Sequence, residues 1–301
     1  MLTEEQYVQQ QIAVGRRIHL HDGVWWEQVY PFYCKPAWVY KAVEPGSARP
    51  SRARSLLGFS HQTVNDGKAN RLLPLMVLDR SGLDGFDLGK LSANLRSKVR
   101  RGLRRCEVRP LTVIDSLLER MREINILQAE RQEAHFGAET PVHRYTKEAD
   151  AWRAQIRREF TLEGREWWGA FVEGQLAAYL RTLQVEDTRV IQQTKADPAF
   201  YRYYPMDALY FTVLSQAAAD PGCRRIINGR PQHESLNHYK EQFFFSAVGI
   251  PWFSSSAWFV GAARRALALA SQVRCLGRKA GPSPTFSVEG GAKHAAGEPT
   301  R

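Results

Sequence analysis

Hydrophobic and polar positions alternate most regularly between Trp167 and Phe245, and the period of the alternation changes along this stretch. The runs 167–172, 176–183 and 190–194 are apolar and β-prone, and turn residues separate them. Glu173-Gly174, between the first two runs, is typical of a tight hairpin. The pattern therefore predicts three consecutive strands that pair in antiparallel fashion.

A helical period follows these strands. Pro205 stands where the first residue of a helix tolerates proline, and apolar residues recur at three- and four-residue spacing up to Ala219. A short strand is predicted at 225–229. In the next segment four residues fall at positions i, i+3, i+4 and i+7 of one helix face, namely Leu236, Tyr239, Lys240 and Phe243.

Weaker patterns predict elements on both sides of this stretch. Upstream, we expect a polar helix in the first twenty residues, a loop at 44–54, strands at 73–78 and 108–113, and helices at 91–105, 117–127 and 146–160. Downstream, we expect a strand at 248–254 and an Ala-rich helix at 257–274. The remainder is rich in Gly, Pro, Ser and Ala, a composition typical of disorder.

Composition narrows the class of protein. The 301-residue chain is 44% hydrophobic and 24% charged, as expected for a globular protein with a substantial core. Its four cysteines are scattered without metal-ligand spacing, so we expect free thiols, a reducing compartment and no metal. No apolar run reaches the roughly 18 residues of a membrane span and no signal peptide is evident. We therefore expect a cytoplasmic protein, either free or peripheral to the inner membrane surface.

The charge is strongly positive and favours an anionic partner. The net charge is +11, and six cations occur among residues 96–105. Leu95, Val99 and Leu103 lie four apart in the same predicted helix, so one face is apolar and the rest is basic. Arg100 and Arg101 are candidate substrate contacts, because guanidinium forks match phosphate geometry. The same pattern is typical of a solvated helix face, so both interpretations stay open.

Three segments of the chain are similar to a known family: the basic segment 95–101 (LRSKVRR), the helix start 204–209 (YPMDAL) and the segment 236–243 (LNHYKEQF). They resemble the GNAT acyltransferase superfamily, and within it the branch of FemAB-like aminoacyltransferases and acetyltransferase-like proteins of bacterial polysaccharide clusters. The segment 236–243 is similar to the aromatic-Lys-x-x-Phe signature of that branch. The resemblance covers residues 91–254. It implies an α+β fold, with a GNAT-like mixed, mostly antiparallel sheet flanked by helices, and transfer of an acyl group to an amine.

The resemblance also implies a division of the chain. A GNAT-like acyltransferase domain is expected at 91–275 and a disordered tail at 276–301. Residues 1–90 would then be an N-terminal elaboration or a degenerate second GNAT-like half.

The phosphate-binding loop departs from the superfamily pattern. A typical GNAT protein holds the pyrophosphate of acyl-CoA on an Arg/Gln-x-x-Gly-x-Gly/Ala loop, whose backbone N–H groups lie at a helix N-terminus. The corresponding residues here are 202–207 (RYYPMD), in which proline removes a donor and the aspartate would repel phosphate. The donor therefore stays open between acyl-CoA and aminoacyl-tRNA. Its candidate binding residues are Arg202, Tyr204, Met206 and Asn237.

Lys240 and Tyr239 are the candidate catalytic residues. By the resemblance, Lys240 stabilises the oxyanion formed when an amine attacks the donor carbonyl, and Tyr239 is a general acid for the leaving group. Each has a structural alternative, because a lysine can pack its stem while its head reaches water and a tyrosine on an apolar stripe can belong to the core.

The third predicted strand supplies the candidate acceptor contacts, Gln192 and Thr194. Neither side chain titrates, and no carboxylate is present on that strand. The general base is therefore open among a water chain, His233, Glu234 and the substrate itself.

The leading hypothesis is an N-acyltransferase that acts on an amine of a sugar, a peptide or a cell-envelope precursor such as a peptidoglycan precursor. The alternative is a non-catalytic GNAT-like module that binds nucleic acid or an anionic membrane surface through its basic helix and the helix at 257–274. The missing glycine loop favours the alternative, whereas a lysine within an apolar stripe favours the enzyme.

Overall fold

The computed structural model describes residues 1–44, 46–64, 66–136 and 142–255. Met1–Ser255 form one compact unit. The helix predicted at 257–274 and the tail predicted at 276–301 lie outside the described residues.

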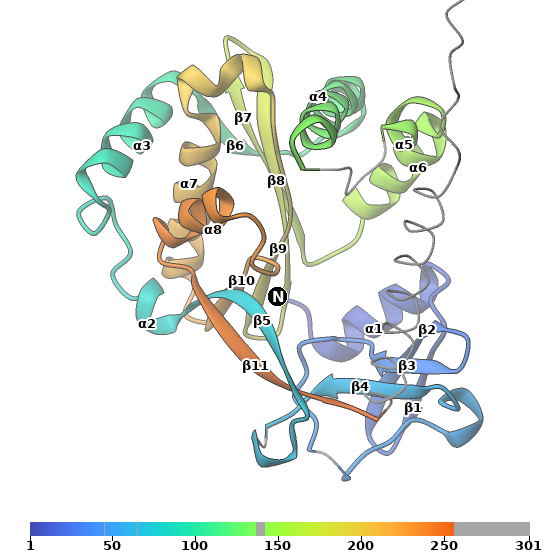
Figure 1. Cartoon of the computed structure of the whole chain (residues 1–301). Helices are drawn as coiled ribbons and strands as arrows, with labels where there is room; N and C mark the ends of the chain where they lie inside the picture. The colour runs from blue at the N-terminus through green and yellow to red at the C-terminus, as the bar shows by residue number, and fades with distance from the viewer. Residues whose placement is uncertain (45, 65, 137–141, 256–301) are drawn as a thin grey trace, which may run out of the picture. The chain divides into compact units, whose positions relative to one another are not determined.

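The strands of the described residues form one sheet in the order β1-β2-β3-β4-β11-β5-β10-β9-β8-β7-β6 (Figure 1). Neighbouring strands are antiparallel except for the pairs β3–β4 and β9–β10, which are parallel. The sheet is therefore mixed and mostly antiparallel, which confirms the expected fold class. The strands are β1 Ile18–His21, β2 Val24–Tyr30, β3 Tyr33–Pro36, β4 Gly58–Gln62, β5 Arg71–Asp79, β6 Glu107–Pro110, β7 Arg165–Val172, β8 Gln175–Val185, β9 Thr188–Ala196, β10 Arg225–Ile227 and β11 Ser246–Ser254.

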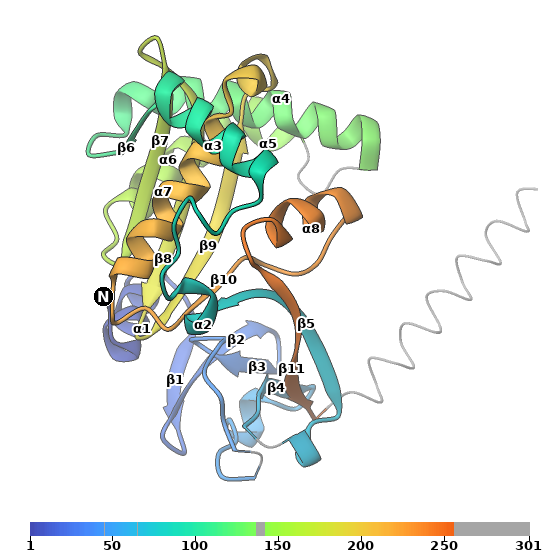
Figure 2. The same cartoon turned by 90° about the vertical axis from the view of Figure 1, so that its left-hand side faces the viewer.

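Helices cover both faces of the part of the sheet formed by β6 to β9 (Figures 1 and 2). On one face lie α3, α7 and α8, and on the other lie α4, α5 and α6. The α-helices are α1 Glu4–Ala13, α2 Arg80–Leu83, α3 Ala93–Arg105, α4 Leu118–Phe136, α5 His143–Thr146, α6 Ala149–Phe160, α7 Pro205–Ala219 and α8 Glu234–Glu241, and a 3-10 helix, η4, spans Pro198–Tyr203.

Two hydrophobic cores follow from this arrangement. Ala178 of β8 packs with Leu209 and Val213 of α7 in one core, and Tyr179 of β8 packs with Ile124 of α4 in the other. Successive residues of a strand point to opposite faces, so β8 supplies both cores in turn. The same alternation lets β8 and β9 present polar side chains to either side of the sheet.

The prediction of α7 agrees with the structure at both ends, with Pro205 in the first helical position. Ser92 caps α3 by accepting a hydrogen bond from the backbone N–H of Leu95. Two predicted elements were too long. The helix expected at 146–160 begins later, at Ala149, as α6, since residues 143–146 form the separate helix α5. The strand expected at 108–113 ends at Pro110, which has no N–H to donate to the sheet.

The first ninety residues share the sheet with the rest of the chain. β5 lies between β10 and β11 and pairs with both, for example through Leu78 opposite Ile226 and Leu75 opposite Val248. Arg80, directly after β5, donates hydrogen bonds to the carbonyls of residues 218, 220 and 223, and so closes the C-terminal end of α7.

β9 and β10 separate after a short common stretch. Only residues 188–190 of β9 pair with β10, although β9 continues to Ala196. On its other edge β9 contains a bulge, because Arg181 lies opposite Gln193 whereas Thr182 lies opposite Ile191, which leaves Gln192 as the extra residue. The free half of β9 therefore borders an opening in the sheet.

Candidate active site

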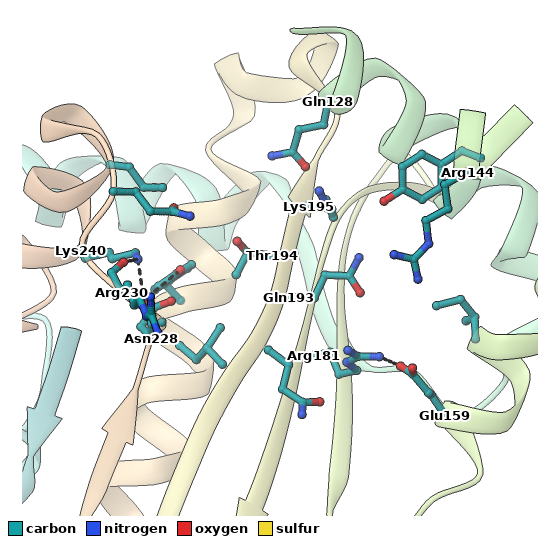
Figure 3. Close-up of a pocket in the computed structure, with 18 of the residues that line it drawn as sticks. Gln128, Arg144, Glu159, Arg181, Gln193, Thr194, Lys195, Asn228, Arg230 and Lys240 are labelled. Atoms are coloured by element: carbon teal, nitrogen blue, oxygen red, sulfur yellow. Dashed lines mark hydrogen bonds and ion pairs between the residues drawn. The ribbon is translucent and has the colours of Figure 1, made fainter. Parts of the chain in front are cut away.

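A cavity of about 420 Å³ lies at the opening between β9 and β10 (Figure 3). Side chains from both faces of the sheet form its wall. The polar residues on the wall are Gln128, Arg144, Gln155, Glu159, Arg181, Gln192, Gln193, Thr194, Lys195, Tyr210, Asn228, Arg230, Gln232 and Lys240. Among these described residues five are lysine or arginine and Glu159 is the one carboxylate, so the cavity attracts anions.

Lys240 projects from α8 into this wall and is buried, with 5% of its surface exposed. Its Nζ donates hydrogen bonds to the backbone carbonyl of Asn228 at 2.8 Å and to that of Arg230 at 3.4 Å. An ammonium group has three N–H donors, so these bonds leave one for a ligand in the cavity. Burial lowers the pKa of Lys240 from its ordinary value.

Tyr210 and Asn228 form the wall beside Lys240. The Tyr210 hydroxyl accepts a hydrogen bond from Nδ2 of Asn228 at 3.1 Å and also interacts with the hydroxyl of Thr194. Burial raises the pKa of Tyr210, so its phenol stays protonated at neutral pH. The α7 wall thus contains a proton donor.

Tyr239 lies behind this wall. Its ring packs against those of Tyr210 and Phe243, with centroid distances of 5.4 Å and 5.5 Å. Its hydroxyl faces the carboxyl group of Asp207, although it forms no hydrogen bond of regular geometry with any described residue. Burial, followed by the charge of Asp207, raises the pKa of Tyr239 well above its ordinary value, and burial raises the pKa of Asp207 to about 6.

The N-terminus of α7 lacks the backbone donors of a phosphate cradle. Its cap, Tyr204, has a left-handed backbone with φ of 59°, and Pro205 has no N–H. Asp207 places a carboxyl group in the first turn, at the positive end of the helix dipole. The residues present therefore do not fit a pyrophosphate held by backbone N–H groups.

Cationic side chains surround this helix end instead. α3 packs so closely here that a Cβ on Gly102 would lie 2.6 Å from the carbonyl oxygen of Tyr204. The close approach brings the guanidinium of Arg101 over the Tyr204 ring, at 4.6 Å from its centroid. Arg105 donates to the carbonyl of Arg202 at 3.4 Å, and the charge of Lys98 acts on Asp207.

The structure brings three predicted site residues together at the cavity: Gln192, Thr194 and Lys240. Four others lie around the α7 N-terminus, namely Arg101, Arg202, Tyr204 and Met206. Arg202 is exposed and donates a hydrogen bond to the hydroxyl of Tyr203, and Met206 packs against the core. Arg100 lies on the exposed face of α3, and Asn237 bonds to the backbone of Gln232. Their roles in donor and acceptor binding stay predictions.

The cavity wall also contains residues that were not among the candidates from the sequence, and Arg144, Arg181, Tyr210, Asn228 and Arg230 are examples. Two signals were present. Arg181 is a charged residue within an apolar predicted strand, and residues 228–230 follow the end of a strand in a parallel pair, where ligand sites are common in α/β sheets. Tyr210 gave no signal, because its spacing on α7 is that of a core residue.

Within the described part of the chain, no three His, Cys, Asp or Glu side chains lie close enough together to hold a metal ion. None of the helices described there is both long and apolar enough to cross a membrane.

Residues 90–241 match the family described as acetyltransferase (GNAT) domain, a match that covers half of the chain. Among solved structures, FemX has a TM-score of 0.55 at 10% identity and aligns over 83% of this chain and 90% of its own. The C-terminal domain of a protein assigned as a lysylphosphatidylglycerol synthetase, from Agrobacterium fabrum, has a TM-score of 0.51 at 12% identity over 90% of this chain and 91% of its own.

A conserved protein of unknown function from Bacteroides thetaiotaomicron gives a TM-score of 0.50 at 13% identity over 84% of this chain and 89% of its own. No curated protein sequence matches the chain. At such identities the structural likeness concerns the fold, and it confirms the expected resemblance to FemAB-like proteins. Since the family match spans half of the sequence, the chain belongs to the GNAT acetyltransferase family and is a transferase.

Proposed function

We propose that the protein is an N-acyltransferase that moves an acyl or aminoacyl group from a phosphate-bearing donor to an amine of a sugar, a peptide or a cell-envelope precursor. The main support is the buried Nζ of Lys240, which is aimed by two backbone carbonyls and keeps one N–H for the cavity at the free edge of β9.

The reaction is direct attack of the acceptor amine on the donor carbonyl carbon. The C–N bond forms as the carbonyl π electrons move to oxygen, and the tetrahedral intermediate then breaks its bond to the leaving thiolate or alkoxide. The amine loses a proton to water in the cavity, and the leaving group takes up a proton. No covalent enzyme intermediate is needed, so the protein contributes positioning and charge stabilisation.

Groups on both walls of the cavity can serve these steps. The N–H of Lys240 and backbone N–H groups of the bulged, half-unpaired β9 can donate to the oxyanion. The phenol of Tyr210 can protonate the leaving group. In this mechanism Tyr239 positions Tyr210 by packing against its ring.

The donor is an acyl-CoA or a charged tRNA, both of which are found in the cytoplasm, where we place the protein. The name of the lysylphosphatidylglycerol synthetase neighbour fits the aminoacyl alternative. Either donor would contact Lys98, Arg101 and Arg105 through side chains, since the backbone at α7 offers no cradle.

Binding measurements with acetyl-CoA and, separately, with lysyl-tRNA distinguish the donors. Free CoA and uncharged tRNA are the matched controls for recognition of the acyl group. If neither donor binds, the proposal has no donor and is wrong. Salt-dependent binding that does not distinguish charged from uncharged tRNA, without transfer, would favour the non-catalytic polyanion-binding function.

Replacement of Lys240 tests the catalytic step. We expect Lys240→Met to lower the transfer rate by about 10²–10³-fold, as for loss of an oxyanion donor, while the dissociation constant of the donor stays the same. Lys147→Met, at an exposed lysine, is the matched control and should keep the full rate. A Lys240→Met protein with an undiminished rate would exclude this residue from catalysis.

A further inference from the structure

The cavity has a second polar region on the α6 face of β9, across this strand from Lys240 (Figure 3). Arg181 of β8, Arg144 of α5, and Gln155 and Glu159 of α6 form it. We call these four residues the arginine lobe. The proposed mechanism assigns them no task.

Hydrogen bonds link the side chains of the arginine lobe in one chain. Nη2 of Arg144 donates to Oε1 of Gln155 at 2.8 Å, and Nε2 of Gln155 donates to Oε1 of Glu159 at 2.6 Å. Glu159 in turn forms an ion pair with Arg181 (Figure 3). The lobe thus contains two guanidinium groups and a single carboxylate, which pairs with Arg181, and it carries a net charge of about +1 when all three are ionised.

Of the two arginines, Arg181 is the one with a buried hydrogen-bond donor that has no partner in the described part of the chain. Its side chain is 14% exposed, and its Nε is buried without a hydrogen-bond partner among the described residues. Burial, followed by the charge of Arg144, lowers the pKa of Arg181 to about 10. A largely buried cation with an unused donor is unfavourable, and a second anion beside the guanidinium would offset the excess charge.

The geometry favours an oxyanion over a neutral group as that partner. The ring of Trp167 covers one face of the Arg181 guanidinium, at 5.0 Å from its centroid, so the cation is already shielded from one side. Neutral hydroxyl groups of a sugar would leave the excess charge in place. A carboxylate or phosphate matches the guanidinium fork and neutralises the charge. A purely structural ion pair would need only Arg181 and Glu159. Arg144 is a further cation, and it increases the excess of positive charge.

We propose that the arginine lobe binds a carboxylate or phosphate of the acceptor, whose amine reacts across β9 beside Lys240. The acceptor is then an amine that carries its own negative charge within the length of one small cavity, as in an acidic or phosphorylated amino sugar. The assignment of this anionic amine as the acceptor rests on the proposed function, whereas the preference of the arginine lobe for anions does not.

Three related amines serve as probes: glucosamine, glucosamine 6-phosphate and muramic acid, which is glucosamine with a carboxylate-bearing arm. Calorimetric titration of the full-length protein, without any donor, measures their affinities. We expect one or both of the anionic amines to bind at least tenfold more tightly than glucosamine, and the better of the two identifies phosphate or carboxylate as the preferred anion.

Two variants with opposite expected effects test whether the arginine lobe causes the preference for anionic amines. Arg144→Gln should reduce the advantage of the anionic amine about tenfold, whereas Glu159→Gln, which removes the competing carboxylate, should increase it several-fold. Arg158→Gln, at an exposed arginine of α6, is the matched control and should change nothing. Equal binding of the three amines, or an unchanged preference in both lobe variants, would overturn the proposal.

If none of the amines binds measurably, inorganic phosphate is the second probe. It should raise the thermal unfolding midpoint of the wild-type protein and have less effect on Arg144→Gln, and an equal effect on both would overturn the proposal. Because none of these measurements uses turnover, an anion preference without transfer would contradict the proposed function alone. Transfer to neutral and anionic amines at equal efficiency would contradict the arginine lobe alone.

Discussion

The carboxyl group of Asp207 stands in the first turn of α7, where burial outweighs the help it receives from Lys98. Its pKa is raised from the ordinary 3.8 to about 6. The folded protein therefore binds this proton more tightly than the unfolded chain does. Between these two values each increase in pH lowers the free energy of unfolding, and the loss is complete above pH 6.

Asp207→Asn should consequently stabilise the protein at pH 7.5, by on the order of 1–2 kcal/mol after allowance for partial solvent access. The advantage should shrink as the pH falls and disappear below about pH 3, where the wild-type group is protonated in both states. Urea unfolding midpoints at the two pH values provide the measurement. Glu130→Gln, at an exposed carboxyl group in the middle of α4, is the control. A lower stability of Asp207→Asn at pH 7.5 would contradict this expectation and show that the carboxylate stabilises the helix end.

The sequence predicted which residues share a helix face, but not which of them line the cavity. The sequence pattern placed Lys240 and Tyr239 on one helix face. In the structure Lys240 lies on the cavity wall, whereas Tyr239 packs behind this wall against Tyr210. Tyr210 has the spacing of a core residue, and it becomes a cavity residue because β10 turns away from β9 at this level. Periodicity reports burial within an element and contains no information about where neighbouring strands separate.

At the scale of elements, the contact between α3 and α7 depends on Gly102. Alanine is better than glycine in a helix by about 1 kcal/mol. A Cβ here would lie 2.6 Å from the carbonyl oxygen of Tyr204 and 3.1 Å from the Cβ of Ala208, and a backbone oxygen cannot move aside cheaply. Overpacking of this kind costs about 1–3 kcal/mol, which exceeds the helical gain.

Gly102→Ala should therefore lower the urea midpoint, by an amount equivalent to about 1 kcal/mol or more. Ser97→Ala, on the exposed face of the same helix, should be neutral or slightly stabilising. A Gly102→Ala protein as stable as the wild type would show that α3 can move away from α7 without loss.

The order of the elements between residues 91 and 254 was predictable because the apolar spacing of most of them is regular, and the bounds of α7 agree at both ends. The basic face of α3 was also visible in the sequence. What could not be predicted was its division, in which Arg101 and Arg105 turn toward the α7 N-terminus while Arg100 faces solvent. That division depends on the position of Gly102 against Tyr204, a tertiary contact.

At the scale of the whole molecule, β5 connects the first ninety residues to the remainder. Alternation predicted this strand but not its neighbours, since a strand pattern does not specify pairing over long separations in the sequence. β5 pairs with β10 and β11, and Arg80 closes the end of α7. The proposed boundary at residue 90 thus divides a single sheet.

We expect a chain that begins at residue 91 to lack a cooperative unfolding transition, because β11 loses both of its neighbours, β4 and β5, and β10 becomes an unpaired edge of the sheet. Thermal unfolding followed by circular dichroism is the measurement. Co-expression of residues 1–90 as a separate chain should restore the transition. A sharp transition in the shorter chain alone would support an autonomous domain at 91–275.

The position of β11 between β4 and β5 has a consequence for synthesis on the ribosome. β4 and β5 are synthesised early, but both pair with β11, which is synthesised much later. Until then their edges expose unpaired backbone groups to other nascent chains. Residues 1–90 cannot complete their part of the sheet as they emerge from the ribosome, in contrast to the usual N-terminal-first folding order of multidomain proteins. Chaperone protection during translation is therefore most needed before residues 246–254 leave the exit tunnel.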